Sequence, residues 1–247
     1  TWCTWSGKSI VDGTYRLSIF ARKNVTVNKW SESNSYRDLA QDPAYEFLVG
    51  STMTTVQPYD LIETGASCYK CHGELGFHGY GRGGYDTCLA CHGTAGAEDR
   101  PQYVAANATA TTQVGVDFRA MIHKIHMGAE LTNGSTYVVN GFGQGYPNNF
   151  SEHMYDTVEF PVMPSGVMNC AHCHGSADAW TDPGDRNHPT EQVMPAREWR
   201  VTCNSCHDSS DAVAHTDVMT NGLGAESCGV CHGPGKELAV EVVHMVR

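Results

Sequence analysis

The stretch Cys68-Tyr69-Lys70-Cys71-His72 decides how this chain is interpreted, because its pattern, Cys-x-x-Cys-His, occurs five times. The other copies are Cys88–His92, Cys170–His174, Cys203–His207 and Cys228–His232. Each has the form of a c-type haem attachment site, in which two thiols bond the haem and the following His binds its iron. The five copies use ten of the eleven cysteines and leave only Cys3. We therefore predict five covalently bound haem c groups.

Paired cysteines also occur in disulfide scaffolds and in zinc ribbons. A disulfide framework does not require a His after every second Cys. A tetrahedral zinc site does not require that His at one fixed offset from each pair. Haem attachment accounts for both regularities. The predicted haem-bonding thiols are those of Cys68, Cys71, Cys88, Cys91, Cys170, Cys173, Cys203, Cys206, Cys228 and Cys231, and the predicted motif ligands of iron are His72, His92, His174, His207 and His232.

The segment from Asp117 to Gly128 is predicted to form an amphipathic helix. The i, i+3, i+4, i+7 spacing of one helix face is present in the apolar residues Phe118, Met121, Ile122 and Ile125. Asp117 suits the start of a helix and Gly128 suits its end. His123 and His126 are three residues apart and therefore project from the same side. In an ordinary domain they would be partly exposed residues beside a core stripe. Here five irons each need a second axial ligand, so we expect both rings to bind iron.

Six further histidines lie outside the motif ligand positions. His78 lies in a Gly-rich turn, His215 follows the fourth motif by eight residues, and His244 ends a mostly apolar run. We expect these three to complete the set of distal ligands. His153 and His188 are interpreted as surface residues, and His172, between the cysteines of the third motif, as pointing away from its own haem. Met is an alternative axial ligand, which the surplus of His disfavours.

The chain divides near residue 66 into two parts of different composition. Residues 1–66 carry no motif, and alternating apolar residues predict strands around Tyr15–Arg22 and Tyr45–Val49, with Val25 and Val27 continuing the first strand or beginning a partner. We interpret this part as a small β element or the end of a larger β domain. Residues 67–247 form the predicted penta-haem domain. Its segment between His92 and Cys170 is predicted to be mostly loop and turn, apart from the one helix.

Composition limits the classes of partner and location. The formal net charge of −11 argues against nucleic acid and anionic membranes as partners. Apolar runs fall short of the roughly 18 residues that a transmembrane helix needs. The chain begins with Thr1 rather than Met, which we interpret as processing of an exported protein. With 26 Gly and few large aliphatic residues, we expect haem to be required for folding. The predicted fold is a mostly irregular multihaem cytochrome fold with short α-helices around five c-haems, preceded by the β element.

The pattern resembles the penta-haem module of the deca-haem cell-surface cytochromes of the OmcA/MtrC type. The resemblance is carried by the five motifs, the segment 122–128, Phe77-His78-Gly79, and Phe160-Pro161 ahead of the third motif. It covers residues 67–247 and implies distal ligand roles for His78, His123, His126, His215 and His244. It also implies a location in the periplasm or beyond, at the outer-membrane surface or outside the cell. This chain departs from the family by carrying one module where such proteins have two.

The function that follows is extracellular electron transfer through closely packed, mainly bis-His haems to an external acceptor: a metal oxide, a flavin, an electrode or another cytochrome. The expected partners are other multihaem cytochromes or copies of this chain. One alternative is a protomer of a conducting filament, in which Cys3 forms a disulfide between subunits or His153 or His188 binds a neighbour's haem. A multihaem reductase with an open coordination position is a second alternative. No Cys-x-x-Cys-Lys motif supports it, so we expect an electron carrier rather than an enzyme.

Overall fold

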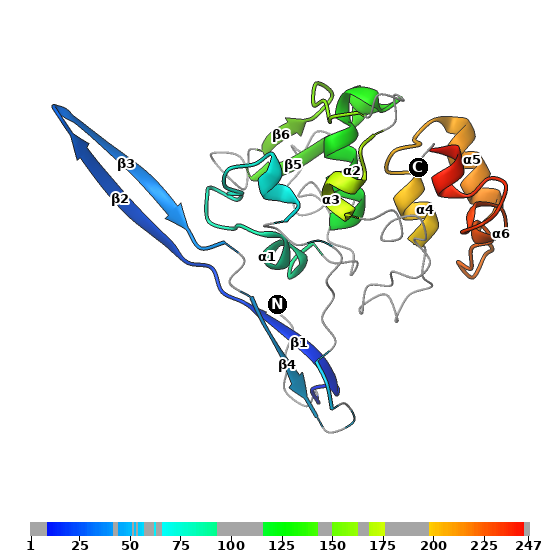
Figure 1. Ribbon diagram of the computed structural model, residues 1–247, viewed down its shortest axis with the longest axis horizontal. Coiled ribbons are helices and arrows are strands. Elements are labelled where there is room, and N and C mark those ends of the chain that lie inside the picture. Colours follow the sequence, from blue (N-terminus) through cyan, green and yellow to red (C-terminus); the bar gives the residue numbers. More distant parts are fainter. Residues whose placement is uncertain are drawn as a thin grey trace. The chain divides into compact units, whose positions relative to one another are not determined.

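The computed structural model describes residues 9–41, 44–50, 52, 54–56, 62, 66–92, 116–142, 150–162, 168–175 and 198–244. Their contacts divide the chain into two units, Thr1–Ala90 and Cys91–Arg247. The first unit contains two strand pairs and short helical turns, and the second contains short helices and one strand pair (Figure 1). None of the helices described is both long and apolar enough to cross a membrane.

Two antiparallel strand pairs form the β part of the first unit. Strand β1 (Gly13–Ser18) pairs with β4 (Ala44–Val49), and β2 (Arg22–Lys29) pairs with β3 (Glu32–Leu39). The predicted strands around Tyr15 and Phe47 are confirmed, and these two residues face each other in the register. The first strand is shorter than predicted, because Ile19–Ala21 lie between β1 and β2. Val25 and Val27 belong to the new strand β2.

Strand β3 was not predicted, because its sequence Glu-Ser-Asn-Ser-Tyr-Arg-Asp-Leu lacks apolar alternation. Its pairing with β2 has a different basis. The register places Lys23 opposite Asp38 and Lys29 opposite Glu32, so unlike charges face each other at both ends of the hairpin. Between them Val25 faces Tyr36. Such cross-strand pairs stabilise a hairpin even when, as here, nearly all of its residues are exposed.

The rest of the first unit packs on these strands and carries the first haem motif. It contains the 3₁₀ turn η1 (Cys68–Lys70) and helix α1 (Tyr85–Leu89). Arg37 donates to the carbonyl of Gly79 at 2.5 Å, and Gln41 donates to the carbonyl of Leu75 at 3.2 Å. The strands and the segment 67–90 therefore lie in one unit, and contacts divide the chain between Ala90 and Cys91. The predicted composition boundary near residue 66 stays a prediction.

The second unit is built from short elements joined by turns. Strands β5 (Val138–Phe142) and β6 (Phe150–Met154) form an antiparallel hairpin, which corrects the prediction that this region was loop apart from one helix. Asn140 and Gly141 lie inside β5. The helical elements are α2 (Phe118–Met127), η3 (Gly128–Glu130), η4 (Gly134–Thr136), α3 (Ala171–His174), α4 (Glu198–Cys203), α5 (Ser210–Val218), α6 (Gly229–His232) and α7 (Val240–Val243).

Helix α2 has the limits predicted from its sequence. The side chain of Asp117 accepts a hydrogen bond from the amide of Ala120 at 3.2 Å, which caps the start of the helix. At the other end Gly128 is required by a close approach: a Cβ atom there would lie 1.9 Å from the carbonyl oxygen of Tyr155. Because no other residue lacks a Cβ, Gly128 allows the segment that follows β6 to pack against the end of α2.

Five apolar side chains are buried among the described residues of the second unit, and two of them lie beside a motif. The five are Val116, Leu131, Tyr137, Trp199 and Ala239. Val116 is next to the N-cap of α2, and its carbonyl lies 2.8 Å from Nδ1 of His92. The ring of Trp199 lies against Gly229 of the fifth motif, where a Cβ would be 3.6 Å from it. Buried apolar residues therefore support at least the second and fifth motifs.

Candidate haem-binding sites

Four of the five motifs fold into the same helical turn. In each, the carbonyl of the first Cys accepts hydrogen bonds from the amide of the second Cys at 3.1–3.2 Å and from the amide of the His at 2.7–3.0 Å. A helical turn brings residues i, i+3 and i+4 to one side. The two thiols and the imidazole therefore share a face, as attachment of a single porphyrin requires. This local geometry holds for the first, third, fourth and fifth motifs.

The second motif lies where the two units divide. Its first cysteine, Cys88, lies in α1, and the amide of Cys88 donates to the carbonyl of Gly84 at 3.1 Å. Its second cysteine and its His belong to the second unit. There Nδ1 of His92 lies 2.8 Å from the carbonyl of Val116, and the ring of His92 contacts Phe118 at 6.2 Å between centroids.

The donor set fits haem c better than the two other interpretations of paired cysteines. The ten motif cysteines are thiols and form no disulfide. Within the residues that the structure describes, no three His, Cys, Asp or Glu side chains gather as they would around a metal ion. Both observations disfavour a disulfide scaffold and a zinc ribbon, and both are compatible with thiols that bond a porphyrin.

Several imidazole rings are oriented by hydrogen bonds from Nδ1 to backbone carbonyls. Nδ1 of His126 lies 2.8 Å from the carbonyl of Ile122, and Nδ1 of His244 lies 2.9 Å from that of Val240. In the motifs, His92 and His232 make the same contact with the carbonyls of Val116 and Leu238, both at 2.8 Å. A carbonyl only accepts, so Nδ1 of a neutral ring must donate and the lone pair lies on Nε2. Haem and metal sites orient their His ligands in this way.

Three predicted distal histidines lie opposite a motif histidine. The ring centroids are 6.0 Å apart for His123 and His174, 5.9 Å for His207 and His244, and 6.3 Å for His215 and His232. Two metal–nitrogen bonds of about 2 Å each, with about 1 Å from each nitrogen to its ring centre, give roughly 6 Å between two rings that share one metal. The three separations therefore match bis-His ligation of one iron in each pair.

Burial favours the neutral form of the His123 and His207 rings. It lowers the pKa of His123 to about 4, and the neighbouring His174, His126 and Arg119 add to this shift. The carbonyl of Arg119 opposes the shift, although its geometry toward Nδ1 falls outside that of a hydrogen bond. Burial and the nearby His244 also lower the pKa of His207. A neutral imidazole is the form that binds metal, so at neutral pH both rings are in the ligand form.

The thiols of neighbouring motifs act on one another. Burial, followed by the charge of Cys170, raises the pKa of the Cys206 thiol to about 12. Burial, followed by the charge of Cys228, raises that of Cys203 to about 11. Since such effects weaken with distance, they indicate that Cys170 is near Cys206 and that Cys228 is near Cys203.

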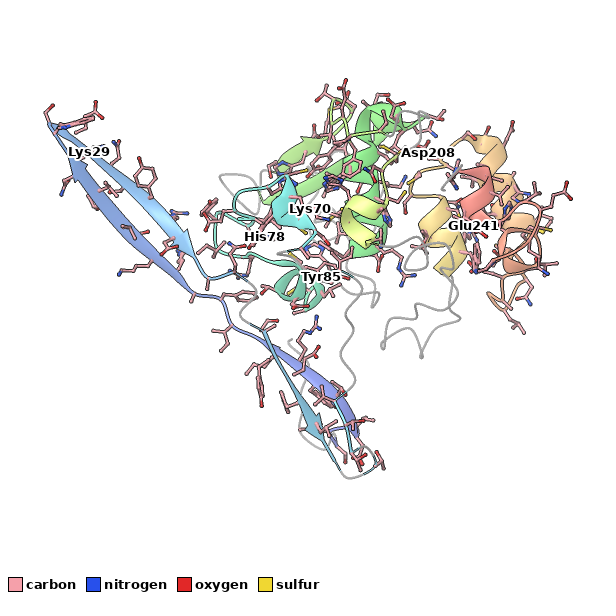
Figure 2. All side chains as sticks on the ribbon, in the orientation of Figure 1. Lys29, Lys70, His78, Tyr85, Asp208 and Glu241 are labelled. Carbon is pink, nitrogen blue, oxygen red and sulfur yellow. The ribbon has the colours of Figure 1, made fainter. Side chains whose placement is uncertain are left out.

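The other candidate histidines have different surroundings. His78 adopts a left-handed conformation, φ 52°, in the turn between Phe77 and Arg82, which form an antiparallel bridge (Figure 2). His126 contacts the edge of Phe160, at 5.5 Å between ring centroids. Iron ligation by all five predicted distal histidines stays a prediction. Phe160 itself also contacts His172, at 6.4 Å.

Of the histidines interpreted as non-ligands, His153 is exposed and its Nε2 lies 2.9 Å from the hydroxyl of Ser151. His172 lies 3.5 Å from the side-chain amide of Asn169. His188 and Cys3 lie outside the described residues, so their predicted roles stay predictions.

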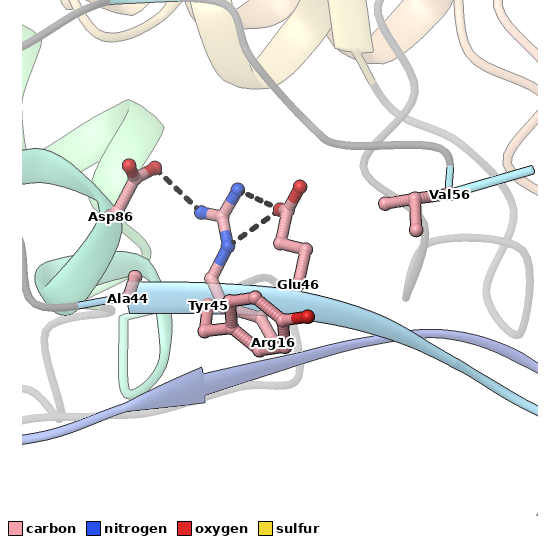
Figure 3. Close-up of a pocket in the computed structure, with 6 residues that line it drawn as sticks. All are labelled: Arg16, Ala44, Tyr45, Glu46, Val56 and Asp86. Atoms are coloured by element: carbon pink, nitrogen blue, oxygen red, sulfur yellow. Dashed lines mark hydrogen bonds and ion pairs between the residues drawn. The ribbon is translucent and has the colours of Figure 1, made fainter.

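The sequence did not reveal the ion pairs around Arg16. In the first unit this residue lines a pocket together with Ala44, Tyr45, Val56 and its two acidic partners (Figure 3). Its guanidinium donates to Glu46 and to Asp86, with N–O distances of 2.8 Å. Asp86 lies two residues before Cys88 of the second motif. The cluster joins β1 and β4 to α1. Because both carboxylates already neutralise the guanidinium, it offers little attraction to an external anion.

Comparisons with known proteins point to one family. The model of the family described as outer membrane cytochrome MtrC/MtrF-like, domains II/IV, matches residues 61–245. The crystal structure of the outer membrane decaheme cytochrome OmcA matches with a TM-score of 0.45 and 22% sequence identity. That match covers 87% of this chain and 27% of that chain, so the chain spans much less than the whole of the relative. No curated protein matches.

Proposed function

We propose, because this chain belongs to the MtrC/MtrF-like outer membrane cytochrome family, domains II/IV, that it is a penta-haem electron carrier working at the outer-membrane surface or outside the cell. Residues 67–247 would form the haem domain, and residues 1–66 the β element that precedes it. The external acceptor would be a metal oxide, a flavin, an electrode or another cytochrome. Other multihaem cytochromes or copies of this chain would be its protein partners.

The observation that carries this proposal is the set of three imidazole pairs. His123 with His174, His207 with His244, and His215 with His232 have the separations expected for two axial ligands of one iron. By elimination, His78 and His126 are the candidates for the irons of the first and second motifs. Each bound haem would supply one-electron chemistry, as its iron changes between the ferric and ferrous states.

The residues support carrying electrons over converting a substrate. Two imidazoles that hold one iron would leave no place on it for a small molecule. In two of the three pairs one ring, His232 or His244, has Nδ1 beside a backbone carbonyl, which would hold that ring in the ligand orientation. A reductase would need one open position, and the three pairs confine that alternative to the first and second motifs.

An electrostatic interaction between motifs supports transfer along the chain. The influence of Cys170 on the pKa of Cys206, and of Cys228 on that of Cys203, favours a close spacing of consecutive attachment sites. Haems bonded to these thiols would be close neighbours in the order three, four, five. Such a row suits a protein that passes electrons from a donor at one end to an acceptor at the other.

Three measurements on the purified protein test the proposal. Mass spectrometry should show five haem adducts on the chain, and low-temperature electron paramagnetic resonance of the oxidised protein should show only low-spin haems. Reduced protein should be reoxidised by ferric chelates, flavins or an electrode with little selectivity. Fewer than five adducts on fully matured chain would refute the penta-haem assignment. A high-spin haem that binds and turns over nitrite would establish the reductase alternative.

A further inference from the structure

Asp208 directly follows the ligand His207 and joins the fourth motif to another part of the second unit (Figure 2). One carboxylate oxygen accepts from the amide of Thr132 at 2.8 Å, and the other accepts from the amide of Asn133 at 3.0 Å. The side chain of Asn133 donates in turn to the carbonyl of Asp208 at 2.6 Å. Three hydrogen bonds thus bind the fourth motif to the segment that follows α2 and η3.

That segment is linked rigidly to the third candidate site. Helix α2 carries His123, whose ring faces His174 of the third motif. The amide of Leu131 donates to the carbonyl of Gly128 at 3.4 Å, and that of Gly134 to Leu131 at 3.3 Å, so tight turns connect α2 to the two amides held by Asp208. Asp208 is therefore a bridge between the third and fourth sites.

Glu226 makes the same kind of bridge between the fourth and fifth sites. Its two carboxylate oxygens accept from the amides of Trp199 and Arg200 at 3.0 and 2.9 Å. These amides lie in the first turn of α4, where the backbone has no partner within the helix. The same helix ends at Cys203, the first residue of the fourth motif, whereas Glu226 lies two residues before Cys228 of the fifth.

The backbone that carries Glu226 is itself held in place. Thr220 and Glu226 form an antiparallel bridge, and the hydroxyl of Ser227 donates to the carbonyl of Met219 at 3.0 Å. Arg200 also forms an ion pair with Asp217 of α5, the helix that carries His215. Helix α4 is thereby fixed to both the ligand helix and the attachment turn of the fifth site.

Both bridges depend on a carboxylate. Each has one oxygen on each of two successive backbone amides, an arrangement that needs two acceptors. A side-chain amide offers only one acceptor, and its NH₂ group would face the second N–H. The geometry points to Asp208 and Glu226 as positioning residues that set the spacing of neighbouring haems, Asp208 between the third and fourth and Glu226 between the fourth and fifth. This inference rests on the proposed penta-haem function.

Near-isosteric variants of the haem-loaded protein test it. Asp208→Asn and Glu226→Gln keep the side-chain shape and lose one acceptor. The matched controls are Glu130→Gln and Glu237→Gln, which remove the same charge from exposed side chains. Glu130 lies two residues before Thr132, and Glu237 follows the fifth motif. Amide hydrogen exchange by mass spectrometry reports the bridge, and spin–spin interaction between oxidised haems in electron paramagnetic resonance reports the spacing.

We expect Asp208→Asn to abolish exchange protection at Thr132 and Asn133 and to weaken the interaction between haems three and four. Glu226→Gln should do the same at Trp199 and Arg200 and for haems four and five. Each variant should retain five haems and leave the other junction unchanged, and the controls should resemble wild type. If an Asp208 variant loses haem, Asn133→Ala, which removes only the bond to the Asp208 carbonyl, should give a partial weakening of the same interaction.

The possible failures are distinguishable. Wild-type protein with fewer than five haems would overturn the proposed function itself. Five haems with unchanged spin–spin interaction in both variants would overturn only the positioning roles, whether or not amide protection is lost. Equal changes in the charge-matched controls would also overturn them, because the effect would then come from the general electric field.

Discussion

At the scale of single residues, histidines of this chain differ in what surrounds their rings. His123 is buried and faces His174, whereas His153 is exposed and contacts a serine hydroxyl. Both are non-motif histidines, and residue type alone does not separate them. Their positions do: His123 lies on a helix between residues of an apolar stripe, and His153 lies on the exposed side of a hairpin. Ligand roles therefore follow from the element that carries each ring.

This contrast gives a matched pair of variants. His123→Ala should convert one of the proposed haems from low-spin to high-spin, because the iron held by His174 would lose its second imidazole. His153→Ala should leave every haem low-spin. The spin state of the haems in both variants can be measured by electron paramagnetic resonance and by the high-spin absorption band near the red end of the visible spectrum. A fully low-spin spectrum for His123→Ala would mean that this ring is ordinary core and not a ligand.

At the scale of elements, α2 depends on its two ends. Asp117 caps the first turn, and Gly128 lets the carbonyl of Tyr155 approach where a Cβ would lie 1.9 Å away. The first contact contributes through a hydrogen bond to an otherwise unpartnered amide. The second is a steric requirement, because any side chain at residue 128 would force the backbone around Tyr155 to move. The free energy of unfolding should therefore be more sensitive to a substitution at Gly128 than to one at Asp117.

Substitution at these positions should show this order. Asp117→Ala should lower the free energy of unfolding by about 1 kcal/mol, the usual value of a lost N-cap. Gly128→Ala should lower it by about 2 kcal/mol or more, because overpacking against backbone cannot be relieved by a rotamer change. Gly13→Ala is the control, since a Cβ there would meet no atom within 4 Å. Urea unfolding of the haem-loaded protein measures all three, and equal midpoints for Gly128→Ala and Gly13→Ala would contradict the packing argument.

The elements also show what the sequence could predict. The attachment turns and α2 were predictable because each depends on residues close in sequence: a fixed five-residue pattern, or a 3.6-residue period between two end signals. Strand β3 was not, because its pairing rests on charges such as Asp38 and Glu32 that face lysines across the hairpin. The bridges of Asp208 and Glu226 join residues 75 and 26 positions apart and leave no local pattern. The sequence could propose His123, His215 and His244 as distal ligands, but it could not say which motif histidine each of them lies opposite.

At the scale of the whole molecule, few apolar side chains are buried among the described residues. In the second unit they include Val116 near His92 and Trp199 near Gly229, each beside one motif. Many helices here have only four to six residues, below the length at which an isolated helix is stable in water. Short helices need tertiary partners, and covalently attached porphyrins would supply them.

We therefore expect the chain to need its haems in order to fold. Chain produced without haem attachment should have little helical circular dichroism and be digested rapidly by protease, whereas haem-loaded chain should resist both heat and digestion. Replacing the Cys228 and Cys231 pair by Ala, which removes one site, should give partial loss confined to α5–α7. The matched control is the same double substitution to Ser, which should behave alike because the loss comes from the haem and not from the size of the side chain. A haem-free chain with native helicity would show that the polypeptide supplies its own core.

The attachment turn has one more consequence, which concerns insertions and deletions. Its hydrogen bonds run from the first Cys to residues only three and four positions later, so the turn is complete within five residues. The motifs begin 20, 82, 33 and 25 residues apart, and the unequal lengths do not alter the turns that the structure describes. Residues can therefore be gained or lost between attachment turns without rebuilding any turn. The chain between the turns is left to set their distance and to carry the distal rings, so the number of turns and the segments between them can change independently in evolution.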